Sequence, residues 1–349
     1  MAENWAPSRG RALDTGLMLP RRAVPVFRTR WAALIVLGSG VAGAYAFPST
    51  GLWPLAFVSV AGLSVAVDAR RSRTGAWLGF VYGLAFFVPL LHWTGIYVGP
   101  APWLLLAAAE AAFLAGLGAV LPLVQRVPGA PVWVGAAWVL QECLRDRLPF
   151  GGFPWGRLAF SQADTPVRWF AALGGAPLVS FAVAVSSAFL AVAVRRILIT
   201  RARLARPVAL ALAGVVAVPA LGALLSLPLG PAPDDHGRTA VVALVQGSVP
   251  DLGLQFEQRA RQVLDNHVAQ TEKLAAEVRA GTAPKPDLVV WPENSSDVDP
   301  LADPSAYALI DRTVRDIGVP VLVGAILQGP GPTHRRNAGI LWSPTTGPG

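Results

Sequence analysis

Hydrophobic residues dominate the chain from residue 31 to about residue 229, where long apolar runs are separated by short loops. A helix needs about 20 apolar residues to cross the hydrocarbon core of a bilayer. The runs therefore predict a membrane domain of about seven transmembrane helices over 31–229. The expected spans are 31–47, 52–68, 76–97, 102–125, 131–148, 168–194 and 207–227.

The pattern changes after a proline-rich linker that begins at residue 230. Short apolar strands then alternate with amphipathic helical segments, which predicts an α/β layer over 230–349. The expected strands are 239–246, 287–291, 319–325 and 338–342, and the expected helices are 255–279 and 304–317. His267 falls on the apolar face of the first of these helices, so it is interpreted as a core or rim residue.

Composition supports an integral membrane protein rather than a large soluble enzyme. Only 14% of the residues are charged, 53% are hydrophobic, and the mean hydropathy is +0.49. A soluble domain would be nearer ~25% charged. The net charge of +8 does not indicate nucleic-acid binding, because the arginines cluster in short loops between apolar segments.

These arginines also predict the topology. They lie in the tail 1–30 and in the loops after the second, fourth and sixth spans, whereas the loops after the first and third spans hold no Lys or Arg. Positive residues mark the cytoplasmic side. We therefore expect a retained cytoplasmic tail, and seven spans would deliver 230–349 to the outer face.

The segment 145–168 departs from this pattern, because it places Arg145, Arg147, Arg157 and Arg168 on an outer loop. Two interpretations stay open. The arginines pair locally with Asp146 and Asp164, or they contact anionic lipid headgroups.

Two carboxylates fall within the apolar spans, where a charge is costly and is usually paired or functional. Glu142 has a candidate partner in Arg145, three residues along the same helical face. Glu110 has no local partner, so a hydrogen bond between helices and a substrate role are both open.

No metal site or cofactor is predicted. The chain has one cysteine, Cys143, and four scattered histidines, without the clustered spacing that metal ligands show.

Glu293 is the strongest candidate for chemistry. It follows the apolar segment Asp287–Trp291 and lies just beyond the expected strand, where α/β folds place their sites. Pro292 stiffens the exit from that strand. A carboxylate held there suits a general base, and a solvated turn residue is the alternative.

Five short stretches together resemble the apolipoprotein N-acyltransferase family, a membrane domain fused to a nitrilase-like domain. They run in family order over nearly the whole chain. The stretches are Leu91-His-Trp-Thr-Gly95, Trp138-Val-Leu-Gln-Glu-Cys-Leu-Arg145, Gly152-Phe-Pro-Trp155 with Phe160-Ser-Gln162, Val245-Gln-Gly-Ser-Val-Pro250 and Trp291-Pro-Glu-Asn-Ser295.

The resemblance implies a multi-span helical domain plus an incomplete αββα sandwich of the nitrilase type. It places the glutamate of the Glu–Lys–Cys triad on Glu293 as general base. The lysine and the nucleophilic cysteine would follow residue 349, so neither role falls on a residue of this chain. The residues that it suggests for substrate binding are Trp93, Glu142, Arg145, Trp155, Gln246 and Trp291.

The implied reaction moves a fatty acyl chain from a phospholipid to the N-terminal amine of a diacylglyceryl-cysteine lipoprotein, in the bacterial plasma membrane. A monomer without nucleic-acid partners is expected. The alternative is an inactive fragment or a lipid- or lipoprotein-binding membrane module. A transporter is disfavoured, because the spans show neither paired charges nor an evident internal repeat.

Overall fold

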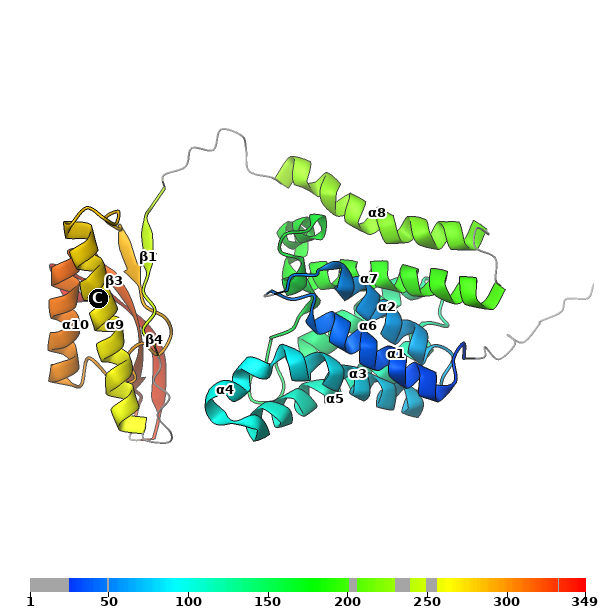
Figure 1. Cartoon of the computed structure of the whole chain (residues 1–349), viewed down its shortest axis with the longest axis horizontal. Helices are drawn as coiled ribbons and strands as arrows, with labels where there is room; N and C mark the ends of the chain where they lie inside the picture. The colour runs from blue at the N-terminus through cyan, green and yellow to red at the C-terminus, as the bar shows by residue number, and fades with distance from the viewer. Residues whose placement is uncertain (1–24, 49, 201–205, 230–238, 249–255, 332) are drawn as a thin grey trace, which may run out of the picture. The chain divides into compact units, whose positions relative to one another are not determined.

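The computed structural model describes residues 25–48, 50–200, 206–229, 239–248, 256–331 and 333–349 (Figure 1). The chain divides into two compact units, Met1–Pro231 and Ala232–Gly349, and each is described by itself. Most of the predicted tail and nearly all of the predicted linker lie outside the described residues.

Unit 1 is a bundle of helices, and each predicted span coincides with one of them. The matching helices are α1 (Thr29–Ala44), α2 (Pro54–Val67), α3 (Ser72–Leu90), α5 (Pro100–Val124), α6 (Ala130–Arg145), α7 (Ala171–Thr200) and α8 (Arg206–Leu229). Within the described residues four helical segments are long and apolar enough to cross a membrane: α3, α5, α7 with the turn before it, and α8. The apolar helices α1 and α2 are shorter.

Three predicted spans extend at least three residues past the helices that the structure shows. The first was expected to reach residue 47, but α1 ends at Ala44. The third was expected to reach residue 97, but α3 ends at Leu90, because Pro89 removes a backbone donor in the last turn. A 3-10 turn and the short helix α4 (Gly95–Val98) follow it. The fifth was expected to reach residue 148, but α6 ends at Arg145, ahead of Pro149, which disfavours helical backbone in the residue before it.

Glycines join α3 to α5 by direct backbone contact. A Cβ atom added to Gly75 or Gly79 would collide with the carbonyl oxygens of Gly118 and Leu114 on α5, respectively. A Cβ atom added to Gly83 would similarly lie 2.7 Å from the Cα of Ala111 on α5. Because lipid supplies no hydrophobic drive between helices, such close packing of small residues is what stabilises a pair inside a membrane.

Unit 2 is a five-stranded mixed sheet covered on one face by two helices. The strand order follows the sequence. Strands β1, β2 and β3 run parallel to one another, β4 pairs antiparallel with β3, and β5 pairs antiparallel with β4. The strands are β1 (Val242–Leu244), β2 (Leu288–Val290), β3 (Val321–Gln328), β4 (Arg335–Ser343) and β5 (Gly347–Pro348), and the helices are α9 (Phe256–Arg279) and α10 (Pro304–Ile317). The predicted strands and helices are confirmed, and β5 was missed.

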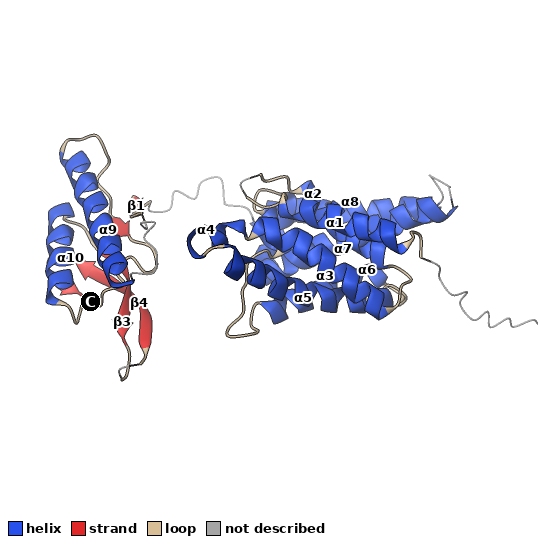
Figure 2. Cartoon of the chain, turned by 60° about the horizontal axis from the view of Figure 1, so that its bottom comes forward, coloured by secondary structure: helices blue, strands red, loops and turns tan. Residues whose placement is uncertain are grey.

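Helices α9 and α10 lie side by side on the same face of this sheet (Figures 1 and 2). Their cover buries Val321, Val323 and Ala325, which alternate along β3. In unit 2, Leu244 is 80% exposed and Leu341 is 51% exposed, so the opposite face presents apolar side chains. We call this side the open face of the sheet.

Candidate functional site

Glu293 lies three residues beyond the end of β2, in a segment that hydrogen bonds firmly to β3. The backbone N–H of Ser296 donates to the carbonyl of Gly324 at 3.0 Å, and the N–H of Ile326 donates to the carbonyl of Ser296 at 3.0 Å. The buried Ser295 hydroxyl also donates to Gly324 O at 2.8 Å. Glu293 itself is exposed, so a rigid backbone presents its carboxylate at the surface.

Gly324 allows this segment to approach β3 so closely. A Cβ atom on Gly324 would lie 2.9 Å from the Cα of Glu293 and would collide with the carbonyl of Pro292. Gly324 pairs with Gly339 of β4 in the sheet register. Neither residue carries a side chain, and this opens the space over β3 through which Glu293 reaches β4.

Asn337 of β4 meets Glu293 across that space. Its side-chain Nδ2 donates a hydrogen bond to Glu293 Oε1. The two residues belong to a surface cavity of about 380 Å³. The residues that line it are Trp291, Glu293, Leu322, Gly324, Asn337, Ala338 and Gly339. Sequence reasoning missed Asn337, because only the order of the strands brings β4 to the end of β2.

Trp291 lies in the core, beneath α9. Its Nε1 donates to Thr271 Oγ1 at 2.9 Å, and its ring lies 5.6 Å from that of His267. His267 is 2% exposed, which confirms its interpretation as a core residue. Burial lowers the pKa of His267, so the imidazole is neutral near pH 7, and its Nδ1 donates to Val263 O at 2.7 Å.

Gln246 follows β1 and lines a different groove from Glu293. That groove of about 360 Å³ runs between β1 and side chains of α9 such as Gln270 and Lys273. The side chain of Gln246 bonds locally, with Nε2 donating to Gly247 O at 3.0 Å. The structure therefore does not bring Gln246 into the cavity of Glu293.

In unit 1, Arg145 pairs with Glu110 and not with Glu142. Arg145 Nη1 lies 2.9 Å from Glu110 Oε2, and both side chains are buried. The expected pairing of Glu142 with Arg145 was wrong, because helical spacing alone ignored the neighbouring helix α5. For Glu110, the hydrogen bond between helices is confirmed.

Glu142 instead binds the start of the 3-10 turn Leu158–Gln162, which follows the loop after α6. Its Oε1 accepts hydrogen bonds from Trp138 Nε1 and from the backbone N–H of Leu158, each at 3.0 Å. The side chain is buried. Glu142 thus satisfies buried donors and fixes the path of the chain.

Arg145 holds the preceding loop in the same way. Its Nη1 also donates to Phe153 O at 2.9 Å and to Trp155 O. The ring of Trp155 lies 5.1 Å from that of Trp93, and the two indoles are 51% and 45% exposed. We call Trp93, Phe153 and Trp155 the aromatic patch.

The other arginines of this loop are divided between the two interpretations. Arg157 forms an ion pair with Asp146, so local pairing is confirmed for it. Arg147 and Arg168 are exposed and donate to the backbone carbonyls of Cys143 and Ala163. Their charged groups remain accessible at the surface.

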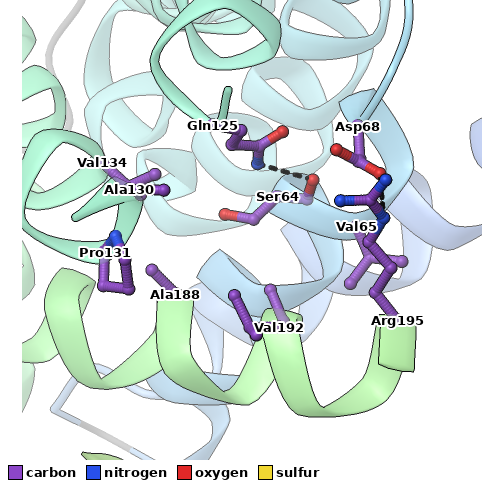
Figure 3. A pocket seen from close by; sticks show the side chains of 11 residues that line it. Ser64, Val65, Asp68, Gln125, Ala130, Pro131, Val134, Ala188, Val192 and Arg195 are labelled. Atoms are coloured by element: carbon purple, nitrogen blue, oxygen red, sulfur yellow. Dashed lines mark hydrogen bonds and ion pairs between the residues drawn. The ribbon is translucent and has the colours of Figure 1, made fainter. Parts of the chain in front are cut away.

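A smaller cavity, of about 50 Å³, lies in unit 1 between residues of α2, α6 and α7 and the end of α5 (Figure 3). Arg195 Nε lies 2.6 Å from Asp68 Oδ2 beside it, and Gln125 Nε2 donates to Ser64 O at 2.9 Å. It is too small for a lipid chain, and none of the predicted site residues lines it.

Within the described ranges, no group of three or more His, Cys, Asp and Glu residues could hold a metal ion. Cys143 is a free, partly buried thiol on α6.

Comparisons with known proteins identify relatives of both parts of the chain. Residues 39–189 match the family model described as the apolipoprotein N-acyltransferase N-terminal domain. The chain is 40% identical to the apolipoprotein N-acyltransferase of Mycolicibacterium smegmatis, over 99% of this chain and 59% of that protein.

Two further relatives carry the same name. The protein of Ralstonia nicotianae is 31% identical over 90% of this chain, and that of Azotobacter vinelandii is 30% identical over 87%. This chain spans 59% and 58% of their lengths. Over the length that it spans, the chain belongs to the apolipoprotein N-acyltransferase family.

Proposed function

We propose that this chain supplies the membrane unit and the general base of an apolipoprotein N-acyltransferase. The reaction would move a fatty acyl chain from a phospholipid to the N-terminal amine of a diacylglyceryl-cysteine lipoprotein. One observation carries the proposal: Glu293 stands on a rigid turn at the end of a parallel strand, beside a cavity, with one carboxylate oxygen held by Asn337.

The chemistry needs a base at two points. Glu293 first accepts the proton of a cysteine thiol, the thiolate attacks the ester carbonyl of the phospholipid, and the leaving alkoxide takes that proton. Glu293 then accepts a proton from the attacking α-amine as the thioester breaks and the thiolate is released. The cysteine, and the lysine that would stabilise the oxyanion, are not assigned to residues of this chain.

The open face of the sheet fits the finer fold that we propose, an αββα sandwich. In such a sandwich a second sheet packs against the first at about 10 Å. Leu244 and Leu341 already provide apolar side chains for that contact. Glu293 and Asn337 would then lie between the two sheets, where water is excluded.

In unit 1 we assign lipid contact to the loop around the aromatic patch. Exposed indoles such as Trp93 and Trp155 are suited to the interface between lipid and water. The exposed cations Arg147 and Arg168 lie in the same loop region and suit a phosphate headgroup. Arg145 and Glu142 would act indirectly, by holding this loop in place.

A multi-pass topology, with unit 2 on the outer face, completes the proposal. The alternation of basic and neutral loops supports seven spans and an outer position for residues after α8. A reporter enzyme fused after residue 240, active only outside the cytoplasm, is the test. Activity on the cytoplasmic side would show that the number of spans is even.

The direct test of function uses the full-length protein with Glu293→Gln. Acyl transfer should fall by about 10²–10⁴-fold, the usual contribution of a general base. Expression and membrane insertion should not change. Glu272→Gln is the matched control, because Glu272 is a solvent-facing carboxylate on α9. Near-normal turnover by Glu293→Gln would remove Glu293 from the mechanism.

The second candidate function is a lipid- or lipoprotein-binding module without chemistry. The single thiol in these 349 residues, Cys143, lies on α6 in unit 1 and not in the unit that carries Glu293. The 349-residue chain with labelled phospholipid should therefore form no hydroxylamine-sensitive adduct. A labelled adduct on Cys143 would show that this chain carries its own nucleophile.

A further inference from the structure

We infer that Asn337 is a positioning residue that orients the Glu293 carboxylate for proton transfer. The inference rests on the proposed role of Glu293 as general base. The amide Nδ2 of Asn337 donates to Glu293 Oε1, so the carboxylate is anchored through one oxygen. The hydrogen bond joins two segments that lie 44 positions apart in the sequence.

The anchor is rigid on both sides. Asn337 lies within the long antiparallel pairing of β3 and β4, opposite Ile326. Glu293 lies on a turn that hydrogen bonds to β3 through Ser295 and Ser296. Because both backbones are fixed, little freedom is lost when the carboxylate meets its reaction partner.

The hydrogen bond also gives the two carboxylate oxygens different roles. With Oε1 bound to the amide, Oε2 is left as the acceptor for the substrate proton. A neutral amide orients the carboxylate without the strong preference for the charged form that an adjacent arginine would impose. Asn337 thus orients the Glu293 carboxylate and leaves its second oxygen open to accept a proton.

Few other charges lie near Glu293. Glu293 is the one titratable side chain among the residues that line its cavity. Arg335 lies on the same face of β4, two residues before Asn337, and its Nη1 donates to His334 O at 3.2 Å, at the hairpin end. Asp297 lies on the segment of Glu293, and Asp299 Oδ2 accepts from the backbone N–H of Gln328 at 2.7 Å.

The test compares Asn337→Ala, Asn337→Asp and the control Arg335→Ala in the full-length protein. The measurements are kcat and KM for acyl transfer, with a thermal melt for each variant. Asn337→Ala should lower kcat by about 10²-fold, as expected when a reacting group loses its orientation, and should change KM little. Arg335→Ala should behave as the wild type does.

The split between kcat and KM separates positioning from a structural role. In Asn337→Ala the loss should fall on kcat, because the carboxylate is present but no longer held in one orientation, while KM and the melting temperature stay close to those of the wild type. Asn337→Asp has the same shape as asparagine but has no amide N–H to donate, so it should lower kcat in the same way. A lower melting temperature without a selective loss of kcat in either variant would overturn the inference.

The outcomes also separate this inference from the proposed function. If Glu293→Gln is inactive while Asn337→Ala turns over normally, Glu293 remains the base and Asn337 does not position it. If Glu293→Gln turns over normally, the proposed function itself fails. If Asn337→Ala does not fold, Asn337→Asp decides alone, and an unchanged kcat in that variant overturns the inference.

Discussion

Arg145 on α6 forms a buried ion pair with Glu110 on α5, with 2.9 Å between Nη1 and Oε2. The same nitrogen donates to the carbonyls of Phe153 and Trp155, which lie in the loop after α6. One guanidinium therefore links helices α5 and α6 to the aromatic patch. Buried charges are tolerated when they are paired in this way.

Removing Glu110 should destabilise unit 1 strongly. Glu110→Ala leaves the buried Arg145 charge without its carboxylate, and breaking a buried pair costs about 3–5 kcal/mol. Thermal unfolding of the detergent-solubilised protein measures the loss. Arg147→Ala is the matched control, because Arg147 is exposed in the same loop. Equal melting temperatures for the two variants would show that the ion pair contributes nothing.

The glycines between α3 and α5 yield a second prediction with a built-in control. Gly118 and Gly116 lie on the same helix, so alanine gains the same helix propensity at both sites, roughly 0.8–1 kcal/mol. A Cβ atom at Gly118 would collide with the backbone of Gly75, whereas at Gly116 it would meet no atom within 4 Å. Gly118→Ala should lower the melting temperature and Gly116→Ala should not.

Overpacking typically costs about 1–3 kcal/mol, which exceeds the gain in propensity. A Gly118→Ala variant as stable as Gly116→Ala would contradict backbone contact between the two helices.

A third prediction concerns the space over β3. A Cβ atom at Gly324 would lie 2.9 Å from Glu293 Cα, but at Gly339 it would make ordinary contact, 3.5 Å from Leu322. Gly324→Ala should displace the turn that carries Glu293, and Gly339→Ala should leave it in place. Hydrogen–deuterium exchange of the peptide over 292–296 measures the difference. Equal protection in both variants would argue against the close approach.

The fourth prediction is a pH dependence in unit 2. Hydrogen bonds from the Arg315 side chain and from Trp342 Nε1 hold the pKa of Asp311 below its ordinary value. A depressed pKa adds stability above the unfolded value, near ~4, and that stability is lost as the pH falls through the folded value.

The protection factors of α10 amides, which correct for the intrinsic pH dependence of exchange, should therefore fall at acid pH in the wild type. In Asp311→Asn, which cannot ionise, the fall should be smaller. An identical acid response in the two proteins would show that Asp311 does not carry the effect.

The sequence predicted best those elements whose boundaries are set by local chemistry. Helix α10 runs over the predicted residues because Asp303 caps its first turn, with Oδ1 accepting from the N–H groups of Ser305 and Ala306. Gly318 ends it in the left-handed region, with φ of 69°. Apolar length likewise located the helices of unit 1.

The sequence could not reveal partners that only the tertiary fold brings together. Arg145 was assigned to Glu142, three residues away, although its ion pair is with Glu110, 35 residues away. Asn337 carried no signal of its own. It meets Glu293 only because β3 lies between β2 and β4 and has a glycine at the crossing point.

The glycine contact between α3 and α5 also constrains how the membrane unit can move. Two helices whose backbones touch cannot slide or rotate past one another without losing that contact, so α3 and α5 are expected to move together. Any rearrangement of unit 1 would therefore take place between other pairs of helices. Among the candidate spans that the structure describes, α8 is the least covered, because only 17% of its most apolar stretch is buried. Unit 1 thus combines two helices fixed by backbone contact with one helix whose apolar stretch is largely uncovered.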